Sequence, residues 1–243
     1  MMIALVRSEF LQIRTLRSTW LVPVILLGLV GLIGGASMAD VGKPGGITPA
    51  ELREPLVVPA GIMSAVAIAL FAAIRVGGEY RYETIAQRFL AAERGRVLAA
   101  KLFTYATVGL VLAAAAIGLG LAIAGPGVSA EGLTLGYDAA GVAGLIASIM
   151  LGAALFGILG VAFALISRSQ TAALLIVIGL FPAEKLAALI LEGNAAYMPY
   201  GLLQSLIDQG GAVSPPVGGI LLSVTAAATA LVAWRLVARR DVT

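Results

Sequence analysis

The sequence predicts an all-α membrane protein that crosses the bilayer six times, with an interfacial helix at its start and short outer re-entrant helices before its last span. Three observations predict this class: 60% of the 243 residues are hydrophobic, only 12% are charged, and the mean hydropathy is +1.02. Soluble domains carry about 25% charged residues. Aromatic residues make up only 6% whereas glycine occurs 30 times, which favours helices packed through small residues over a lipid-facing β-barrel.

The chain contains no cysteine and no histidine. It therefore cannot form a disulfide, a zinc site with Cys or His ligands, an iron–sulfur cluster or a catalytic triad that depends on histidine. We expect no catalytic residue and no metal site in this chain.

Six apolar runs are long enough to be spans, since a helix needs roughly 20 residues to cross about 30 Å of hydrocarbon. These runs are Trp20–Ala39, Leu56–Val76, Leu102–Ala124, Ala139–Ile166, Thr171–Leu191 and Val217–Val237. With six crossings, thirteen of the sixteen Lys and Arg residues fall on one side of the membrane. Cytoplasmic loops carry such an excess, so the sequence predicts one membrane domain over residues 1–243 with both termini in the cytoplasm.

The segment before the first span, residues 1–18, predicts an amphipathic helix. Its apolar residues recur at spacings of three and four, at Ile3, Val6, Phe10 and Ile13. Arg7 and Arg14 lie beside this stripe, a pattern that suits a helix at the inner membrane surface, where guanidinium groups meet anionic lipid. The alternative is a solvent-exposed leader whose charge only sets the topology.

The loop between the second and third spans is the most informative stretch, because its acidic and basic residues are interleaved. Gly77 and Gly78 are expected to end the second span. Residues Thr84–Ala92 then form a short helix that exposes Ile85 and Phe89 on one side. An apolar pair ringed by charge suits docking in a groove of a soluble partner. The alternative is a solvated connector whose arginines anchor the span ends.

A second unusual segment, residues 182–215, follows the fifth apolar run. Pro182, Glu184 and Lys185 interrupt that run. A charged side chain at mid-bilayer costs at least about 2.5 kcal/mol, so both charges are expected near the outer surface or against protein. The segment is predicted to form one or two short helices that dip into the outer leaflet. We favour a local ion pair between Glu184 and Lys185, and the alternative is a proton or substrate site.

The chain resembles a family of membrane subunits. The segment Gly78, Glu79, Tyr80, Arg81, Thr84 and Ile85, leading into Arg94, Gly95, Arg96, Leu98, Ala99, Lys101 and Leu102, resembles the Gly-Glu-Tyr-Arg-x-x-Thr-Ile and Arg-x-x-x-Ala-Lys segments of actinobacterial ABC-2 permeases. The run Tyr197, Met198, Pro199 and Tyr200 is similar to the Leu-Pro-aromatic outer helix of that group. The resemblance covers almost the whole chain and implies the permease of a type V ATP-binding-cassette exporter in a bacterial plasma membrane.

The resemblance also implies site residues. Loop two, residues 78–101, would hold a coupling helix in a cleft of a separate ATPase subunit, and Arg168 would be the second coupling point. The implied coupling residues are Glu79, Tyr80, Arg81, Glu83, Thr84, Ile85, Arg88, Phe89 and Arg168. The implied residues of an outer gate are Pro182, Glu184, Lys185, Tyr197, Pro199 and Tyr200.

We expect no cofactor in this chain, with ATP and Mg²⁺ on the partner subunit, because the sequence holds no G-x-x-x-x-G-K-[S/T] phosphate loop. The expected partners are two copies of an ATP-binding-cassette ATPase, a second permease subunit, identical or homologous, and membrane lipids, but no nucleic acid. A mostly apolar route favours export of a hydrophobic or amphiphilic cargo, such as a drug, a peptide antibiotic or a lipid. The alternatives are a secondary transporter or channel that uses Glu184 and Lys185, and a membrane scaffold without transport.

Overall fold

The computed structural model describes residues 2–15, 21–38, 53–130, 139–191, 194–207 and 213–239. Within these ranges the chain forms helices joined by short turns, so the all-α prediction is confirmed. The elements are α1 (Met2–Thr15), α2 (Leu21–Met38), α3 (Arg53–Arg81), α4 (Thr84–Ala91), α5 (Arg94–Ala130), α6 (Ala139–Ser167), α7 (Gln170–Leu191), the 3₁₀ helix η2 (Asn194–Tyr197), α8 (Pro199–Ile207) and α9 (Pro215–Arg239).

Five of these helices are long and apolar enough to cross a membrane. The stretches are Ala60–Arg81, Arg94–Ile123, Ala143–Ser167, Gln170–Ile190 and Pro215–Arg239. They belong to α3, α5, α6, α7 and α9, and correspond to the second to sixth predicted spans. The first predicted span falls on α2, whose described apolar stretch, Leu21–Ile33, is shorter, and Trp20 and Ala39 lie outside the described residues. The structure thus has the features of a multi-pass membrane protein with five candidate spans.

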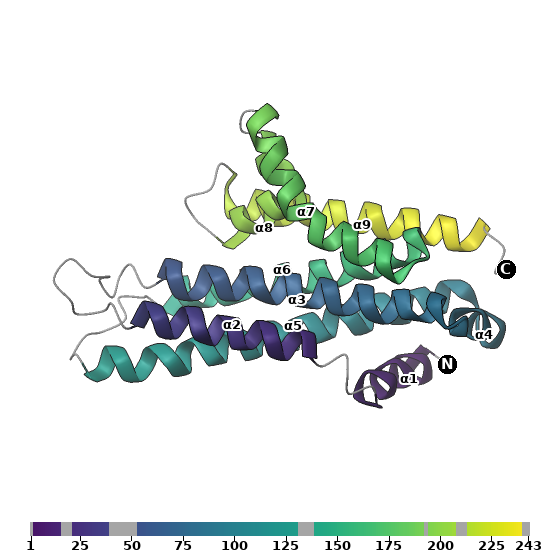
Figure 1. Ribbon diagram of the computed structural model, residues 1–243, viewed down its shortest axis with the longest axis horizontal. Helices are drawn as coiled ribbons and strands as arrows, with labels where there is room; N and C mark the ends of the chain where they lie inside the picture. The colour runs from purple at the N-terminus through teal and green to yellow at the C-terminus, as the bar shows by residue number, and fades with distance from the viewer. Residues whose placement is uncertain are drawn as a thin grey trace.

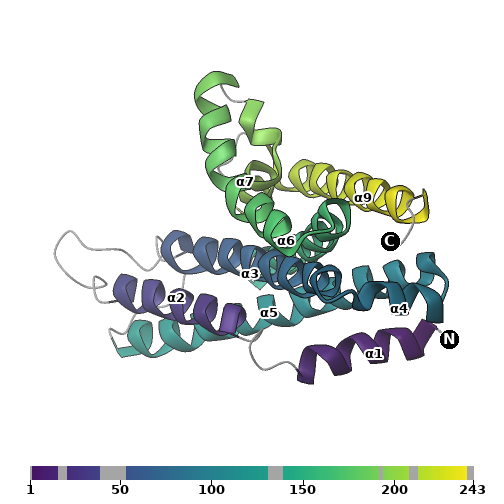
Figure 2. The ribbon, with the colours of Figure 1, turned by 45° about the vertical axis from the view of Figure 1, so that its right-hand side comes forward.

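The helices α3 and α6 form the centre of the bundle. In each, 67% of the most apolar stretch is buried, against 22% for α5 and α9 and 17% for α7. Helices α2 and α5 pack beside α3, whereas α9 packs on α6 and α7 contacts both central helices. Figure 1 shows that α1, α4 and the end of α9 lie at the same end of the bundle. In Figure 2, α7 tilts away from the direction of the other long helices.

Small residues let α5 and α6 approach each other closely, as the composition predicts. A Cβ atom on Gly157 of α6 would lie 2.6 Å from the carbonyl oxygen of Tyr105 on α5. A Cβ atom on Gly109 of α5 would lie 2.6 Å from the carbonyl oxygen of Ala153 on α6. Only glycine fits at both positions without a backbone shift, which is the packing that membrane helices use in the absence of a hydrophobic driving force between them.

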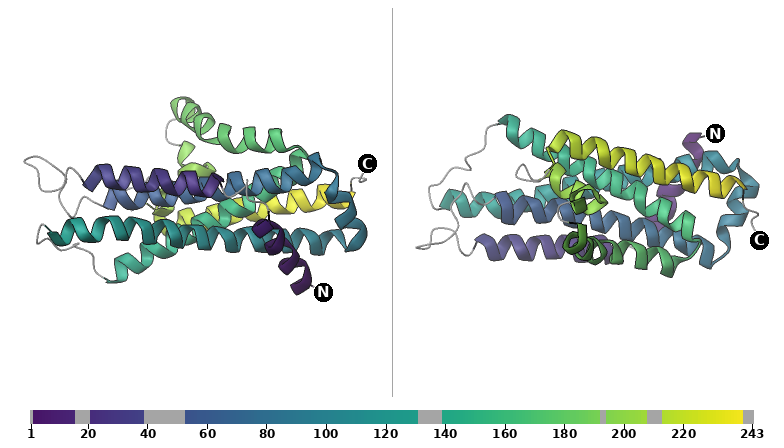
Figure 3. Two further views of the ribbon diagram at one scale, coloured as in Figure 1. Left: turned by 60° about the horizontal axis from the view of Figure 1, so that its bottom comes forward. Right: turned by 90° about the horizontal axis from the view of Figure 1, so that it is seen from above.

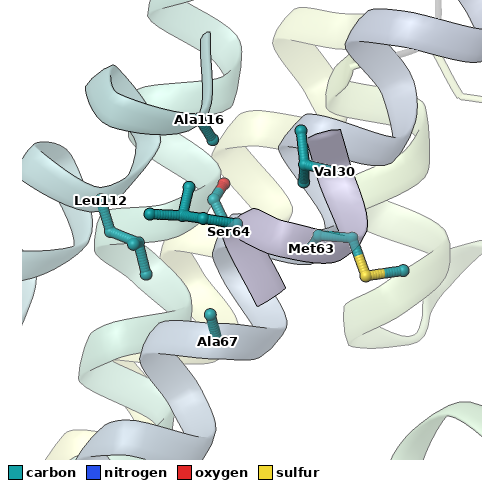
Figure 4. Close-up of a pocket in the computed structure, with 7 residues that line it drawn as sticks. Val30, Met63, Ser64, Ala67, Leu112 and Ala116 are labelled. Carbon is teal, nitrogen blue, oxygen red and sulfur yellow. The ribbon is translucent and has the colours of Figure 1, made fainter. Parts of the chain in front are cut away.

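Helix α2 packs on α3 and α5 around a narrow apolar gap (Figure 4). Val30, Met63 and Leu112 line the gap, which is too small to hold a water molecule. Among the described residues of its wall, the one hydroxyl belongs to Ser64, which donates to the Gly61 carbonyl oxygen at 2.9 Å. Those residues therefore offer no free polar group to a ligand, and the gap is a packing feature.

The predicted end of the second span is wrong. Gly77 and Gly78 lie within α3, which continues to Arg81. A Cβ atom on Gly77 would lie 2.6 Å from the Cα atom of Gln170, at the start of α7. The absent side chain of Gly77 is therefore explained by the close approach of two helices, and not by a helix end.

The structure divides the expected re-entrant segment, residues 182–215, between two parts of the fold. Pro182 lies inside α7, which continues to Leu191, so residues 182–191 belong to a long helix. The rest includes η2 and α8, two short helices before α9, with α8 packed against α9 and α6. Residues 192–193 and 208–212 lie outside the described residues.

Candidate functional site

A tight turn joins α3 to the short helix α4 at one end of the bundle. Tyr82 donates its backbone N–H to the Gly78 carbonyl oxygen at 3.0 Å, and Glu83 adopts the left-handed conformation with a φ of 57°. Helix α4 then spans Thr84–Ala91, which confirms the predicted short helix. Its last turn closes with a bond from the Ala92 N–H to the Arg88 carbonyl oxygen at 3.0 Å, and α5 begins at Arg94.

The predicted exposure of Ile85 and Phe89 is wrong. Ile85 is only 3% exposed, and Phe89 is half-buried against the main core. An amphipathic helix buries its apolar stripe wherever its own protein offers a surface, and α3 and α5 offer one here. The exposed apolar residues of this region are Tyr82 in the turn and Leu90 on α4, at 71% and 89% exposure.

Four charged side chains from four helices meet in a buried cluster, which we call the inner ion cluster. Its members are Glu9 of α1, Glu79 of α3, Arg88 of α4 and Lys101 of α5. Lys101 is fully buried, and its Nζ atom lies 3.0 Å from Glu9 Oε1 and 2.6 Å from Glu79 Oε1. Arg88 pairs with Glu9 and lies 3.6 Å from Glu79 Oε1. Each carboxylate thus has two cationic partners.

The inner ion cluster connects the N-terminal helix to the predicted coupling helix. Figure 3 shows that α1 lies across the bundle at an angle to the long helices, and it packs against α5. Glu9 is 3% exposed and binds both Arg88 and Lys101. Separating one member from a buried ion cluster would leave an uncompensated charge, which is costly. The cluster therefore fixes the positions of α1, α3, α4 and α5 relative to one another.

The sequence-based prediction included Glu79 and Arg88 but missed Glu9 and Lys101 as partners. One signal was present: Glu9 lies three residues after Val6 and four before Ile13, so it shares a helical face with two apolar residues. A carboxylate on an apolar face requires a buried partner. Lys101 gave no such signal, because a lysine at the start of a span normally extends to the membrane surface.

One cavity of about 440 Å³ brings together the two predicted coupling points. It is lined by five of the nine predicted coupling residues, Tyr80, Glu83, Ile85, Phe89 and Arg168. Arg168 occupies the α6–α7 turn with a φ of 51°. The end of α9 closes the cavity through Val237, whose carbonyl oxygen accepts a bond from Arg94 at 3.1 Å. The other four predicted residues, Glu79, Arg81, Thr84 and Arg88, line a second cavity.

At the other end of α7, the carboxylate of Glu184 binds the start of α8. It accepts backbone N–H bonds from Tyr200 and Gly201, each at 3.0 Å, and Glu184 is 5% exposed. A carboxylate at a helix N-terminus satisfies free amides and opposes the positive end of the helix dipole. The expected ion pair with Lys185 is therefore wrong, and the Lys185 ammonium instead lies 5.5 Å from the Phe181 ring centre.

Three of the six predicted outer-gate residues share a cavity of about 280 Å³, namely Glu184, Lys185 and Tyr200. Pro182, Tyr197 and Pro199 do not line it. The Tyr200 ring contacts Phe181 edge to face, with 5.3 Å between ring centres. Burial, with a smaller contribution from the nearby Glu184, raises the pKa of Tyr200 to about 12, so its hydroxyl stays protonated at neutral pH.

Within the described ranges, no group of three or more acidic side chains is placed to hold a metal ion. Comparison of the chain with protein-family models and with curated proteins finds no match.

Proposed function

We propose that this chain is the membrane permease subunit of an ATP-binding-cassette exporter in a bacterial plasma membrane, with six spans and both termini in the cytoplasm. A separate subunit would hydrolyse ATP with Mg²⁺. The observation that carries the proposal is the single cavity formed by the α3–α4 turn and the α6–α7 turn, with Glu83 and Arg168 in its wall. Two turns far apart in sequence form one surface at the bundle end that also carries α1 and the end of α9.

The packing around α4 supports a role in transmitting movement. Ile85 anchors α4 in the protein, and Arg88 joins it to α1 and α3 through buried charges. Closely packed interiors transmit displacement instead of absorbing it. A push on α4 by an ATPase that closes on ATP would thus move α3 and α5 together, shifting a dimer of permeases from an inward-open to an outward-open state.

The predominantly apolar spans favour a hydrophobic or amphiphilic cargo over a small ion. The alternative of a secondary transporter or channel needs an ionisable residue that is free to exchange protons or bind substrate. Glu184 is bound to two backbone amides, which supports a structural role for it. A membrane scaffold without transport would be purified without an equimolar ATPase subunit, which the experiment below distinguishes.

Charge reversal at the shared cavity tests the proposal. The tagged chain would be purified from its native membrane, and we expect mass spectrometry to identify a subunit with a Walker A phosphate loop in equimolar amount. Glu83→Lys and Arg168→Glu should each reduce the yield of that subunit by about tenfold, as expected when a close interfacial charge contact becomes repulsive. The yield of the permease itself is measured in parallel, and Glu83→Lys should leave it unchanged because Glu83 is exposed in the α3–α4 turn.

Glu93→Lys is the matched control. Glu93 is equally acidic and lies just beyond α4, but it is outside the shared cavity and pairs with Arg96 at 3.0 Å on the surface. The variant Glu93→Lys should therefore leave the complex with the ATPase subunit intact. Full transport activity of the purified chain without an ATPase, or equal loss in all three variants, would contradict the proposal.

A further inference from the structure

A second cavity, of about 510 Å³, lies where α1, α3, α4 and the start of α7 meet, and we call it the arginine cavity. Three of its lining residues are arginines, Arg75, Arg81 and Arg88, against one acidic residue, Glu79. The remaining lining includes the amides of Gln12 and Gln170 and the hydroxyls of Tyr82 and Thr84. The cavity therefore combines an excess of positive charge with many neutral hydrogen-bonding groups.

Among the described residues, only some of the charged side chains that line the arginine cavity form salt bridges. Arg88 and Glu79 belong to the inner ion cluster, and Lys101 and Glu9 complete it. Arg75 lines the cavity, and its Nε atom is closed to solvent and has no hydrogen-bond partner among the described residues. An anion that enters the cavity would therefore bind the part of the Arg75 guanidinium that lines it and the exposed Arg81.

The neutral polar groups of the lining call for a second kind of partner. Glu79 Oε1 binds Lys101 and Oε2 is closed to solvent, so hydroxyls of a ligand would instead meet Gln12, Gln170 and Thr84. A ligand that fits this lining carries an anionic oxygen for the arginines and hydroxyls for the neutral groups. The planar guanidinium group matches the geometry of phosphate oxygens.

We propose that the arginine cavity binds the phosphate group of an anionic phospholipid whose headgroup also carries hydroxyls. The position of α1 favours a lipid over free phosphate as the source. Gln12 of α1 lines the cavity, while Ile3 and Phe10 on the outer side of α1 are 84% and 37% exposed. Exposed apolar side chains next to Arg7 and Arg14 are typical of a helix that lies in the headgroup region of an anionic bilayer.

Binding to the purified, delipidated full-length chain in neutral detergent tests this proposal. The probes are phosphatidylglycerol, which has a phosphate and two hydroxyls, and zwitterionic phosphatidylcholine, which has no hydroxyl in its headgroup. Native mass spectrometry would count the lipids retained per chain across a titration. We expect one phosphatidylglycerol to bind at concentrations at which phosphatidylcholine does not.

Two variants and a control locate the site. Arg81→Gln and Arg75→Gln should each weaken phosphatidylglycerol binding by about fivefold, the value of one basic side chain near anionic lipid. Arg239→Gln removes an exposed arginine from the end of α9, at the same end of the bundle, and should leave binding unchanged. If Arg75→Gln does not fold because Arg75 is partly buried, the exposed Arg81 still allows the test through Arg81→Gln.

Three results would overturn the proposal. The first is equal binding of the two lipids, and the second is the same loss in Arg81→Gln and Arg239→Gln. The third is competition by inorganic phosphate at the same concentration as the lipid, which would make free phosphate the ligand.

Discussion

Two regions of the molecule use buried charge in different ways. At the end of the bundle that carries α4, Glu9, Glu79, Arg88 and Lys101 form ion pairs between side chains of four helices. Where α7 meets α8, the single carboxylate of Glu184 binds two backbone amides of α8. Ion pairs shared among four side chains join several helices so that they move together, whereas a carboxylate on a helix N-terminus fixes one helix to another. We infer that the α4 region transmits movement and that Glu184 holds a short helix in place.

The largest effect is expected from Lys101→Met, which breaks the inner ion cluster at its most buried member. Lys101 is 0% exposed and bridges Glu9 and Glu79. Its removal leaves two carboxylates close together with Arg88 as their remaining partner in the cluster. We expect the free energy of unfolding to fall by about 3–5 kcal/mol. Thermal unfolding in detergent, followed by tryptophan fluorescence, measures this loss.

The double variant Lys101→Met with Glu79→Gln provides the control for that experiment. It removes one charge of each sign, so it should recover part of the lost stability, because a balanced buried cluster tolerates neutral replacement better than a missing partner. If Lys101→Met alone is as stable as the original chain, the cluster contributes no net stability. That result would remove the contrast between the inner ion cluster and the Glu184–α8 contact.

The fold was largely predictable because membrane helices are set by long apolar runs. Five predicted spans coincide with helices that are long enough to cross a bilayer. Their ends were less predictable: α5 begins at Arg94, eight residues before the predicted Leu102, because charged residues at a helix end continue the helix beyond the hydrocarbon. Gly77 was misread since a glycine at a helix crossing and a glycine at a helix end look alike in sequence.

The candidate site was predictable only in part. Loop composition located α4 and its turn, because the helical spacing of Ile85 and Phe89 is a local property. The direction in which that apolar pair points depends on where α3 and α5 lie, which is a tertiary property. The partners of Glu9 and Glu184 lie 79 and 16 residues away in sequence, so no short motif reveals them.

A smaller effect is expected from Glu9→Gln, which tests whether the inner ion cluster holds α1 on the bundle. The chain has no cysteine, so one introduced cysteine reports its own accessibility. Ile13 is 4% exposed on the same face of α1 as Glu9. Loss of a charge-assisted hydrogen bond should increase maleimide labelling of Ile13→Cys by about tenfold when Glu9→Gln is added.

The position Ile3→Cys is the control for that labelling. Ile3 is 84% exposed, so its labelling rate should be the same with or without Glu9→Gln. An unchanged rate at Ile13→Cys would mean that apolar packing alone keeps α1 in place. A rise at both positions would indicate unfolding of α1 itself.

The smallest effect is expected from Glu184→Gln, at the contact between α7 and α8. Glutamine keeps one acceptor oxygen for α8 but loses the second acceptor and the charge opposite the helix dipole. The free energy of unfolding should therefore fall by about 1 kcal/mol. Labelling of Ile13→Cys should not change, because the Glu184 carboxylate binds α8 whereas the Glu9 carboxylate of α1 binds Arg88 and Lys101. The cargo profile should not change either, since Glu184 faces backbone amides of its own protein. A shifted cargo profile at normal expression would instead assign Glu184 to the transport route. A higher labelling rate at Ile13→Cys would show that the Glu184–α8 contact and the inner ion cluster are coupled.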